Sequence, residues 1–117
     1  MTEMANIDIV KEFQEIEDRI ASDSAQNKDI TGLLRKKARL LKVCYNQISD
    51  AFDAGVLEEV APNFARAISY LNNIKELQEQ IREDASETDA EIEKIHNRIR
   101  DKGMGWILDN LPKKVED

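Results

Sequence analysis

Residues 62–102 read PNFARAISYLNNIKELQEQIREDASETDAEIEKIHNRIRDK, a stretch in which apolar side chains recur every three or four positions and no glycine occurs. Counting by sevens from Phe64 places mostly apolar residues at the two seam positions of a heptad repeat, which is the pattern of a coiled coil. The heptad phase is unchanged along the whole stretch. We therefore predict one continuous coiled-coil helix from Pro62 to Lys102, about 60 Å long from the rise of an α-helix.

The middle of this stretch, EDASETD at residues 83–89, has the weakest seam residues. The sequence from Thr88 to Glu91 has the form of a capping box, in which a threonine hydroxyl and a glutamate carboxylate satisfy backbone groups at the start of a helix. A break near residues 85–88 would therefore give two helices instead of one. The unchanged heptad phase and the absence of glycine and proline in this segment favour the continuous helix.

Two shorter amphipathic tracts precede this stretch. Isoleucine and phenylalanine side chains mark one face of residues 6–21, and a leucine-rich stripe that includes Cys44 marks one face of residues 31–54. Residues 1–30 carry eight acidic and three basic side chains, whereas residues 31–54 carry five basic and two acidic ones. We predict an N-terminal helical hairpin over residues 1–54 with Cys44 buried, packed on the long C-terminal helix.

Composition limits the class of protein. The chain has 117 residues, a formal net charge of -7 and one cysteine. This length suits a single domain, 1–117, and strand signals are absent, so we predict an all-α fold. The negative charge argues against direct nucleic-acid binding, which depends on neutralising phosphates. No apolar stretch is long enough to span a membrane and no signal peptide is recognisable, so we expect a cytoplasmic protein that does not bind membranes.

Residues that carry catalysis or bind cofactors are scarce. His96 is the only histidine, and neither a nucleophile motif nor a glycine-rich phosphate loop occurs. We therefore predict no enzymatic activity, no cofactor and no metal site. The acidic run from Glu83 to Glu93 contains no basic residue. Arg82 lies just before it and Lys94 just after it. We interpret this run as a solvated face, with imitation of nucleic-acid phosphates as the alternative.

Two segments are candidates for binding a protein partner. The first is a basic segment on the second tract, where four side chains lie close together at helical spacing. We favour pairing of this segment with the acidic first helix of the same chain, with docking of an external phosphate, acidic partner surface or membrane headgroup as the alternative. The second is the apolar tail, residues 103–117, where a tryptophan and three aliphatic residues follow a Gly-Met-Gly sequence. That tail either folds on its own bundle or docks on another protein, since tryptophan is enriched at binding hot spots. The candidate residues are Arg35, Lys36, Arg39, Lys42, Trp106, Ile107, Leu108 and Leu111.

A helix as long as 62–102 would extend beyond the shorter tracts. The stripe of Ile92, Ile95 and Ile99 would then have nothing in its own chain to cover it, and exposing it to water would be unfavourable. We therefore predict a homo-oligomer, with a dimer favoured, that uses this stripe as its interface. The sequence as a whole indicates a non-enzymatic helical interaction protein acting as an adaptor, chaperone-like protein or regulatory subunit. The alternative function is an acidic inhibitor that imitates nucleic-acid phosphates and blocks a nucleic-acid-binding protein.

Overall fold

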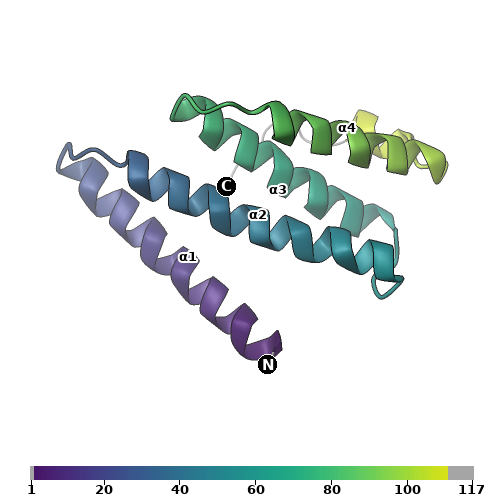
Figure 1. The fold of residues 1–117 in the computed structure, drawn as a ribbon, viewed down its shortest axis with the longest axis horizontal. Helices are drawn as coiled ribbons and strands as arrows, with labels where there is room; N and C mark the ends of the chain where they lie inside the picture. The colour runs from purple at the N-terminus through teal and green to yellow at the C-terminus, as the bar shows by residue number, and fades with distance from the viewer. Residues whose placement is uncertain (1, 111–117) are drawn as a thin grey trace.

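The computed structural model describes residues 2–110, and the side chains of residues 9–109. No strand occurs among the described residues, so the all-α prediction is confirmed. Four main helices follow one another up and down, each beside the next, and a short fifth helix ends the described chain (Figure 1). The helices are α1 (Thr2–Ala25), α2 (Thr31–Ala54), α3 (Ala61–Gln80), α4 (Ser86–Asp101) and α5 (Trp106–Asn110).

The continuous helix predicted over residues 62–102 is wrong. Helix α3 ends at Gln80, and α4 turns back to lie against it (Figure 1). Between them Arg82 has a φ of 61°, in the left-handed region that ends helices, and the Asp84 carboxylate accepts hydrogen bonds from the backbone N–H and the hydroxyl of Ser86. The heptad pattern did not reveal this break, because a hairpin also buries an apolar stripe from each of its two helices.

The break lies close to the alternative position that we considered, but α4 begins at Ser86 and Thr88 does not cap it. The carboxylate of Asp84 binds the first residue of the helix, whereas Thr88 of the predicted capping box is buried. The Thr88 hydroxyl lies 2.6 Å from Oε1 of Gln78 and donates a hydrogen bond to it across the hairpin. Thr88 therefore joins α4 to α3 instead of capping α4.

The α1–α2 turn repeats the geometry of the α3–α4 turn. Asn27 has the same φ of 61° as Arg82, and Asp29 accepts hydrogen bonds from the backbone N–H and the hydroxyl of Thr31. In both turns, an aspartate two residues before a serine or threonine binds the start of the next helix. These short-range interactions satisfy backbone donors that a helix leaves open at its beginning.

The core lies mainly between α2 and α3, which share the largest helix–helix contact, and α4 completes it. Phe64 is fully buried and its ring centroid lies 5.2 Å from that of Phe52. Many of the predicted seam residues of α3 and α4 are in this core. They pack against other residues of the same chain and not against a second copy of it. The buried members are Leu34, Ala38, Leu41, Tyr45, Ile48, Phe52, Phe64, Ala67, Ile68, Leu71, Ile74, Leu77, Ile95, Ile99 and Ile107.

Helix α1 is the least buried of the four main helices. It packs on α2 near their shared turn and diverges from it toward the N-terminus (Figure 1). Among the described side chains of α1, only Ile16 is buried, while Phe13 and Ile20 are partly buried. The expected attraction between the acidic and basic tracts is present as one ion pair among the described residues, in which Lys37 Nζ lies 2.8 Å from Glu17 Oε2.

An ionic cluster joins α4 to the end of α2 and the start of α3. The Arg98 guanidinium binds the carboxylates of Glu59 and Asp53 and lies over the Phe52 ring, 5.4 Å from its centroid. Lys102 Nζ also lies 3.2 Å from Glu59 Oε1. Burial raises the pKa of Glu59, but hydrogen bonds from Arg98 and Lys102 outweigh it and bring that pKa below its usual value. The cluster therefore holds the C-terminal end of α4 against the α2–α3 connection.

Tyr45 provides a test of the contact between α2 and α4. Its hydroxyl donates a 2.9 Å hydrogen bond to Glu91 Oε1, and burial, followed by this contact with a carboxylate, raises the pKa of Tyr45 well above its ordinary value. The unfolded chain loses this proton near pH 10, whereas the folded chain retains it. The contribution of Tyr45 to stability is therefore complete below about pH 10 and is lost as the pH rises further.

We expect Tyr45→Phe to remove the last phenol that ionises in an absorbance titration of the native protein. The variant should also lower the free energy of unfolding at neutral pH by about 1 kcal/mol, the usual net value of one hydrogen bond. Tyr70→Phe serves as the control, because the Tyr70 pKa is also raised by burial but Tyr70 lies on α3. Ionisation of both tyrosines near pH 10 in the native protein would contradict this α2–α4 contact.

Candidate functional site

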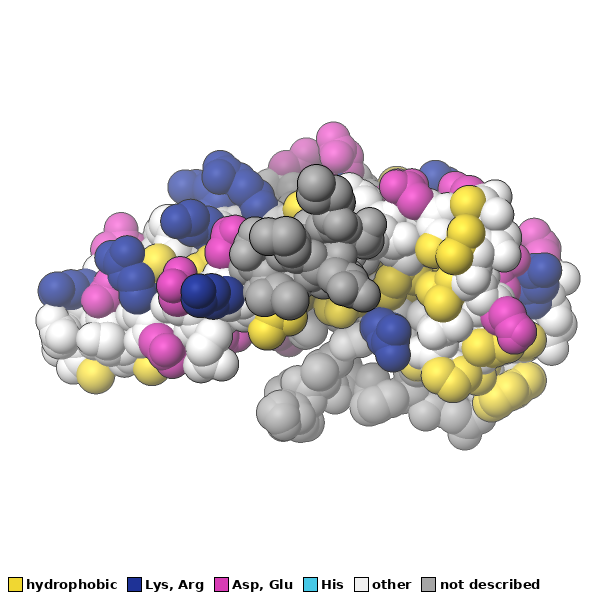
Figure 2. All heavy atoms as spheres, turned by 90° about the horizontal axis from the view of Figure 1, so that it is seen from below, with side chains coloured by type: hydrophobic (Ala, Val, Ile, Leu, Met, Phe, Trp, Pro, Cys, Tyr) yellow, Lys and Arg dark blue, Asp and Glu magenta, His cyan; other side chains and the backbone are white. Residues whose placement is uncertain are grey.

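One end of the bundle exposes large apolar side chains. Val56 and Val60, in the connection between α2 and α3, are 81% and 37% exposed, and Trp106 at the start of α5 is 57% exposed. We call these three residues the end patch. Figure 2 shows hydrophobic side chains at the surface of this end, to the right, where α2 ends. The other exposed large hydrophobic side chains in the described part of the chain, Val10 and Val43, lie on α1 and α2.

The two segments of the end patch are brought together by the ionic cluster. Lys102 contacts Glu59, which precedes Val60, and Lys102 lies four residues before Trp106. Gly55 has a φ of 72° at the end of α2 and Gly103 a φ of 74° after α4, so both chain reversals use a conformation that favours glycine. The apolar side chains are thus presented by two turns that are fixed to each other.

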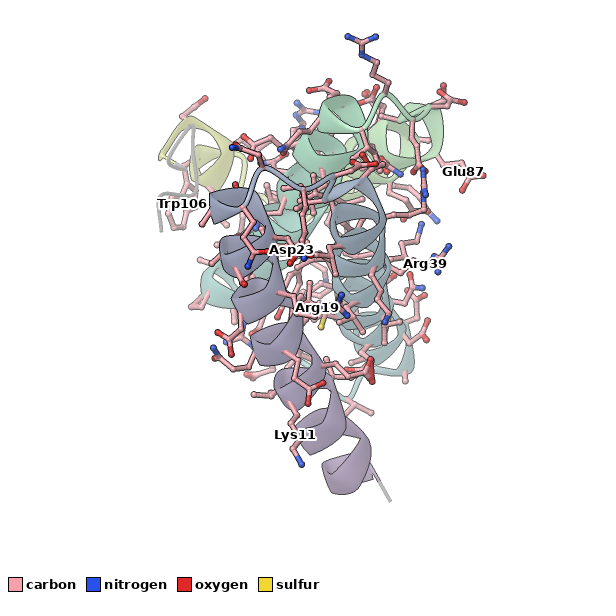
Figure 3. The ribbon with its side chains drawn as sticks, turned by 90° about the vertical axis from the view of Figure 1, so that its left-hand side faces the viewer. Lys11, Arg19, Asp23, Arg39, Glu87 and Trp106 are labelled. Atoms are coloured by element: carbon pink, nitrogen blue, oxygen red, sulfur yellow. The ribbon has the colours of Figure 1, made fainter. Side chains whose placement is uncertain are left out.

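The apolar tail combines the two roles that the sequence left open. Ile107 is buried in the core of its own chain, and Leu108 is partly buried against that core. Trp106 is mostly exposed and lies at the edge of the molecule (Figure 3). Leu111 lies outside the described residues. Ile107 therefore anchors α5 to the bundle, and this anchor positions Trp106 at the surface.

The basic segment is divided between internal pairs and side chains that face solvent. Arg35 Nε lies 2.5 Å from Glu83 Oε2 in the α3–α4 turn, so its partner comes from the C-terminal hairpin and not from α1. Lys36 and Arg39 are exposed and Lys42 is partly buried, and none of the three has an ion-pair partner among the described residues. Figure 2 shows basic side chains gathered toward the end of the bundle that holds the α1–α2 turn.

The basic segment borders a pocket of about 260 Å³ between α2, α3 and the start of α4, which we call the basic pocket. Arg39 and Glu87 lie on the same side of the bundle, away from α1 (Figure 3). The sequence pattern did not predict this pocket, because its far wall comes from α4, which we had expected to continue α3. The lining residues are Arg35, Ala38, Arg39, Lys42, Ile74, Gln78, Glu83, Glu87 and Thr88.

The prediction that Cys44 is buried is only partly correct. Cys44 is partly exposed and lines a second pocket, of about 250 Å³, together with residues of α1 and α3. Burial raises the pKa of the Cys44 thiol, and a hydrogen bond with Tyr70 lowers it by less. A raised pKa reduces the fraction of reactive thiolate at neutral pH. Helix α1 covers this part of α2 incompletely, because it diverges from α2 toward its N-terminus.

The stripe that we predicted as an oligomer interface is covered within the chain. Ile99 is fully buried, Ile95 is 3% exposed, and Ile92 packs at the edge of the same core. The prediction of an interface rested on a helix that extends beyond its neighbours, and α4 does not. This stripe therefore no longer provides a reason for self-association.

The acidic run between Glu83 and Glu93 is partly engaged inside the molecule. Glu83 pairs with Arg35, Asp89 pairs with Lys75, and Glu91 accepts the Tyr45 hydroxyl. Among the described residues, no group of three histidine, cysteine, aspartate or glutamate side chains is arranged to hold a metal ion. Within the same residues, no helix is long and apolar enough to cross a membrane.

His96 lies on α4 and is partly buried. Burial, followed by the nearby charge of Arg100, lowers the pKa of His96 below its usual value. The neutral imidazole is therefore the favoured form at neutral pH. Comparison with protein-family models, curated proteins and solved structures finds no match to this chain.

Proposed function

We propose that this protein is a non-enzymatic helical interaction protein that binds another protein through the end patch, in an adaptor, chaperone-like or regulatory role. The observation that carries the proposal is that Val56 and Trp106 are both mostly exposed and belong to two turns that the ion pair between Lys102 and Glu59 joins. Large apolar side chains exposed together mark interaction surfaces more often than isolated ones do. Tryptophan is also among the residues enriched at binding hot spots.

The way the end patch is held favours binding. Burial of Ile107 and the contact between Lys102 and Glu59 order the patch in the free protein. A surface that is already ordered loses less conformational entropy when it binds a partner. Three side chains are too few for a stable interface of about 1,200 Å² or more, so the surrounding polar residues must form its rim.

The rim indicates the charge of the partner. Residues 53–60 and 98–109, which carry the end patch, contain five acidic and three basic side chains. Arg98 and Lys102 are already paired with carboxylates of the ionic cluster, whereas Glu58, Asp101 and Asp109 are exposed. A partner with an apolar anchor surrounded by basic side chains is therefore the best complement.

This function still includes binding to another protein, but it does not include a coiled-coil dimer. The stripe of Ile92, Ile95 and Ile99, on which the predicted dimer was based, is covered within the chain. The alternative function, an acidic inhibitor that imitates phosphates, has weaker support. Four carboxylates of its main acidic run are engaged within the chain, which leaves fewer available to a nucleic-acid-binding groove. The two functions differ in salt dependence, since a phosphate-like surface loses affinity steeply with added salt and an apolar interface does not.

We expect Trp106→Ala to abolish most of the co-purification of a partner from the native cells, because loss of a central aromatic anchor costs about 2 kcal/mol or more of binding free energy. The melting temperature should change little, because most of the Trp106 side chain is exposed. Val43→Ala, which removes an exposed apolar side chain on α2 outside the end patch, is the matched control and should retain the partner.

Three results would count against this proposal. The first is a partner retained equally by wild-type protein, Trp106→Ala and Val56→Ala. The second is a complex that dissociates when salt is raised modestly, which would favour the phosphate-imitating inhibitor. The third is a melting temperature lowered as strongly by Trp106→Ala as by Ile107→Ala, which would show that Trp106 serves the fold.

A further inference from the structure

The basic pocket contains positive charge that the protein does not neutralise. Arg35 is paired with Glu83, but Arg39 and Lys42, about one and two turns further along α2, have no carboxylate partner among the described residues. Their three-residue spacing places both on one face of the helix. This is unusual in a chain with a net charge of -7, where carboxylates outnumber basic groups. The unpaired cations lie in a concavity and not on a convex surface.

The remaining walls provide complementary contacts. Ala38 leaves room between the two cations and the opposite helices, and Ile74 adds an apolar surface. Glu87 and Thr88 belong to the first turn of α4, so the partial positive charge of this helix N-terminus lies at the pocket wall. Asp84 accepts hydrogen bonds from the backbone N–H and the hydroxyl of Ser86, and the N-cap residue Ala85 makes no side-chain hydrogen bond to the start of α4.

Size and charge limit the ligand. The pocket volume of about 260 Å³ lies below the range of about 300–1,000 Å³ usual for drug-sized ligands, so the ligand is small. Glu87 on the opposite wall would repel a second anionic group. Nucleic acids and other polyanions therefore fit poorly, whereas a molecule with one anionic group and one apolar part fits well.

We propose that the basic pocket binds a small phosphate monoester, with its phosphate group between the Arg39 guanidinium and the Lys42 ammonium and its organic group against Ala38 and Ile74. Guanidinium and ammonium groups bind phosphate through charge-assisted hydrogen bonds. This inference is independent of the end patch, because the pocket is formed by α2, α3 and the start of α4, away from the α2–α3 connection. Either proposal can fail while the other holds.

The test is a titration of the full-length protein, followed by amide NMR, with phenyl phosphate as the probe and inorganic phosphate as the comparison. Sodium chloride keeps the ionic strength constant, because exposed charges are screened by salt. We expect saturable shifts at Ala38 and Thr88 with millimolar phenyl phosphate and weaker binding of inorganic phosphate. Equal affinity for both would overturn the role of the apolar wall, and no saturable shift at these residues would overturn the proposal.

Variants distinguish this site from general attraction to positive charge. Arg39→Gln and Lys42→Gln should each weaken phenyl phosphate binding about tenfold, the effect of losing one charge-assisted contact. Lys36→Gln, on the same helix but outside the pocket lining, is the matched control and should bind as the wild type does. Glu87→Gln should bind more tightly. Equal weakening by Arg39→Gln and Lys36→Gln, or unchanged affinity in Glu87→Gln, would contradict the placement of the ligand.

Discussion

Replacing Ile95 with aspartate is expected to unfold the protein and not merely to dissociate an oligomer. Ile95 is 3% exposed and lies in the core formed by α2, α3 and α4. An unpaired carboxylate in such a position costs about 3–5 kcal/mol, and the lost apolar contacts add to this cost. The total is comparable to the whole stability of a small domain, about 5–15 kcal/mol.

Circular dichroism during heating and light scattering measure the two outcomes separately. Asn97→Asp, an exposed position on the same helix that introduces the same charge, is the matched control and should keep the wild-type melting curve. A variant at Ile95 that stays helical and melts as the wild type does, but with half the molecular mass, would show that the stripe of α4 is an interface between copies. It would also contradict the intrachain hairpin of α3 and α4.

Replacing Phe64 with alanine is expected to produce the second largest effect. Phe64 is fully buried near the start of α3, and its ring packs against Phe52 at the end of α2. Truncation of a buried phenylalanine leaves a cavity and costs about 3–5 kcal/mol. In a domain of this size, that loss lowers the melting temperature by about 10 °C or more.

Urea denaturation measures this loss, with the midpoint lowered and the slope unchanged if the variant keeps the same fold. Val56→Ala is the control, because Val56 is close to this contact in sequence but mostly exposed, and it should change the midpoint little. A small loss, below about 1 kcal/mol, for Phe64→Ala would mean that α2 and α3 do not pack in the register described here. Phe64→Leu should recover much of the stability, since it refills most of the cavity.

Local patterns in the sequence were enough to place the first two helices and several helix ends. The period of the apolar residues predicted the helical class, because a helix must bury one stripe whatever it packs against. The second helix was predicted at Thr31–Ala54, the range observed for α2. Gly55 ends that helix in the left-handed conformation. These features depend on interactions within a few residues, which the sequence displays directly.

The candidate sites were predictable only as lists of residues. Arg39 and Trp106 stood out in the sequence because of their charge and apolar area, and both are exposed. The sequence did not show that Arg35 would be neutralised by Glu83, or that Val56 and Val60 would lie near the segment leading to Trp106. Each of these arrangements joins segments far apart in the chain, and no periodicity encodes them.

The sequence by itself determined that the chain is helical, which face of each helix is apolar and where the turns after the first two helices lie. Only the tertiary structure decided what each apolar face packs against. The stripe of Ile92, Ile95 and Ile99 is compatible with a coiled coil between chains and with a hairpin within one chain, because both arrangements remove the same apolar area from water. The turn at Arg82 and Asp84, together with Tyr45 and the Arg98 cluster, selects the hairpin. That choice buries the predicted interface and brings the wall of the basic pocket against α2.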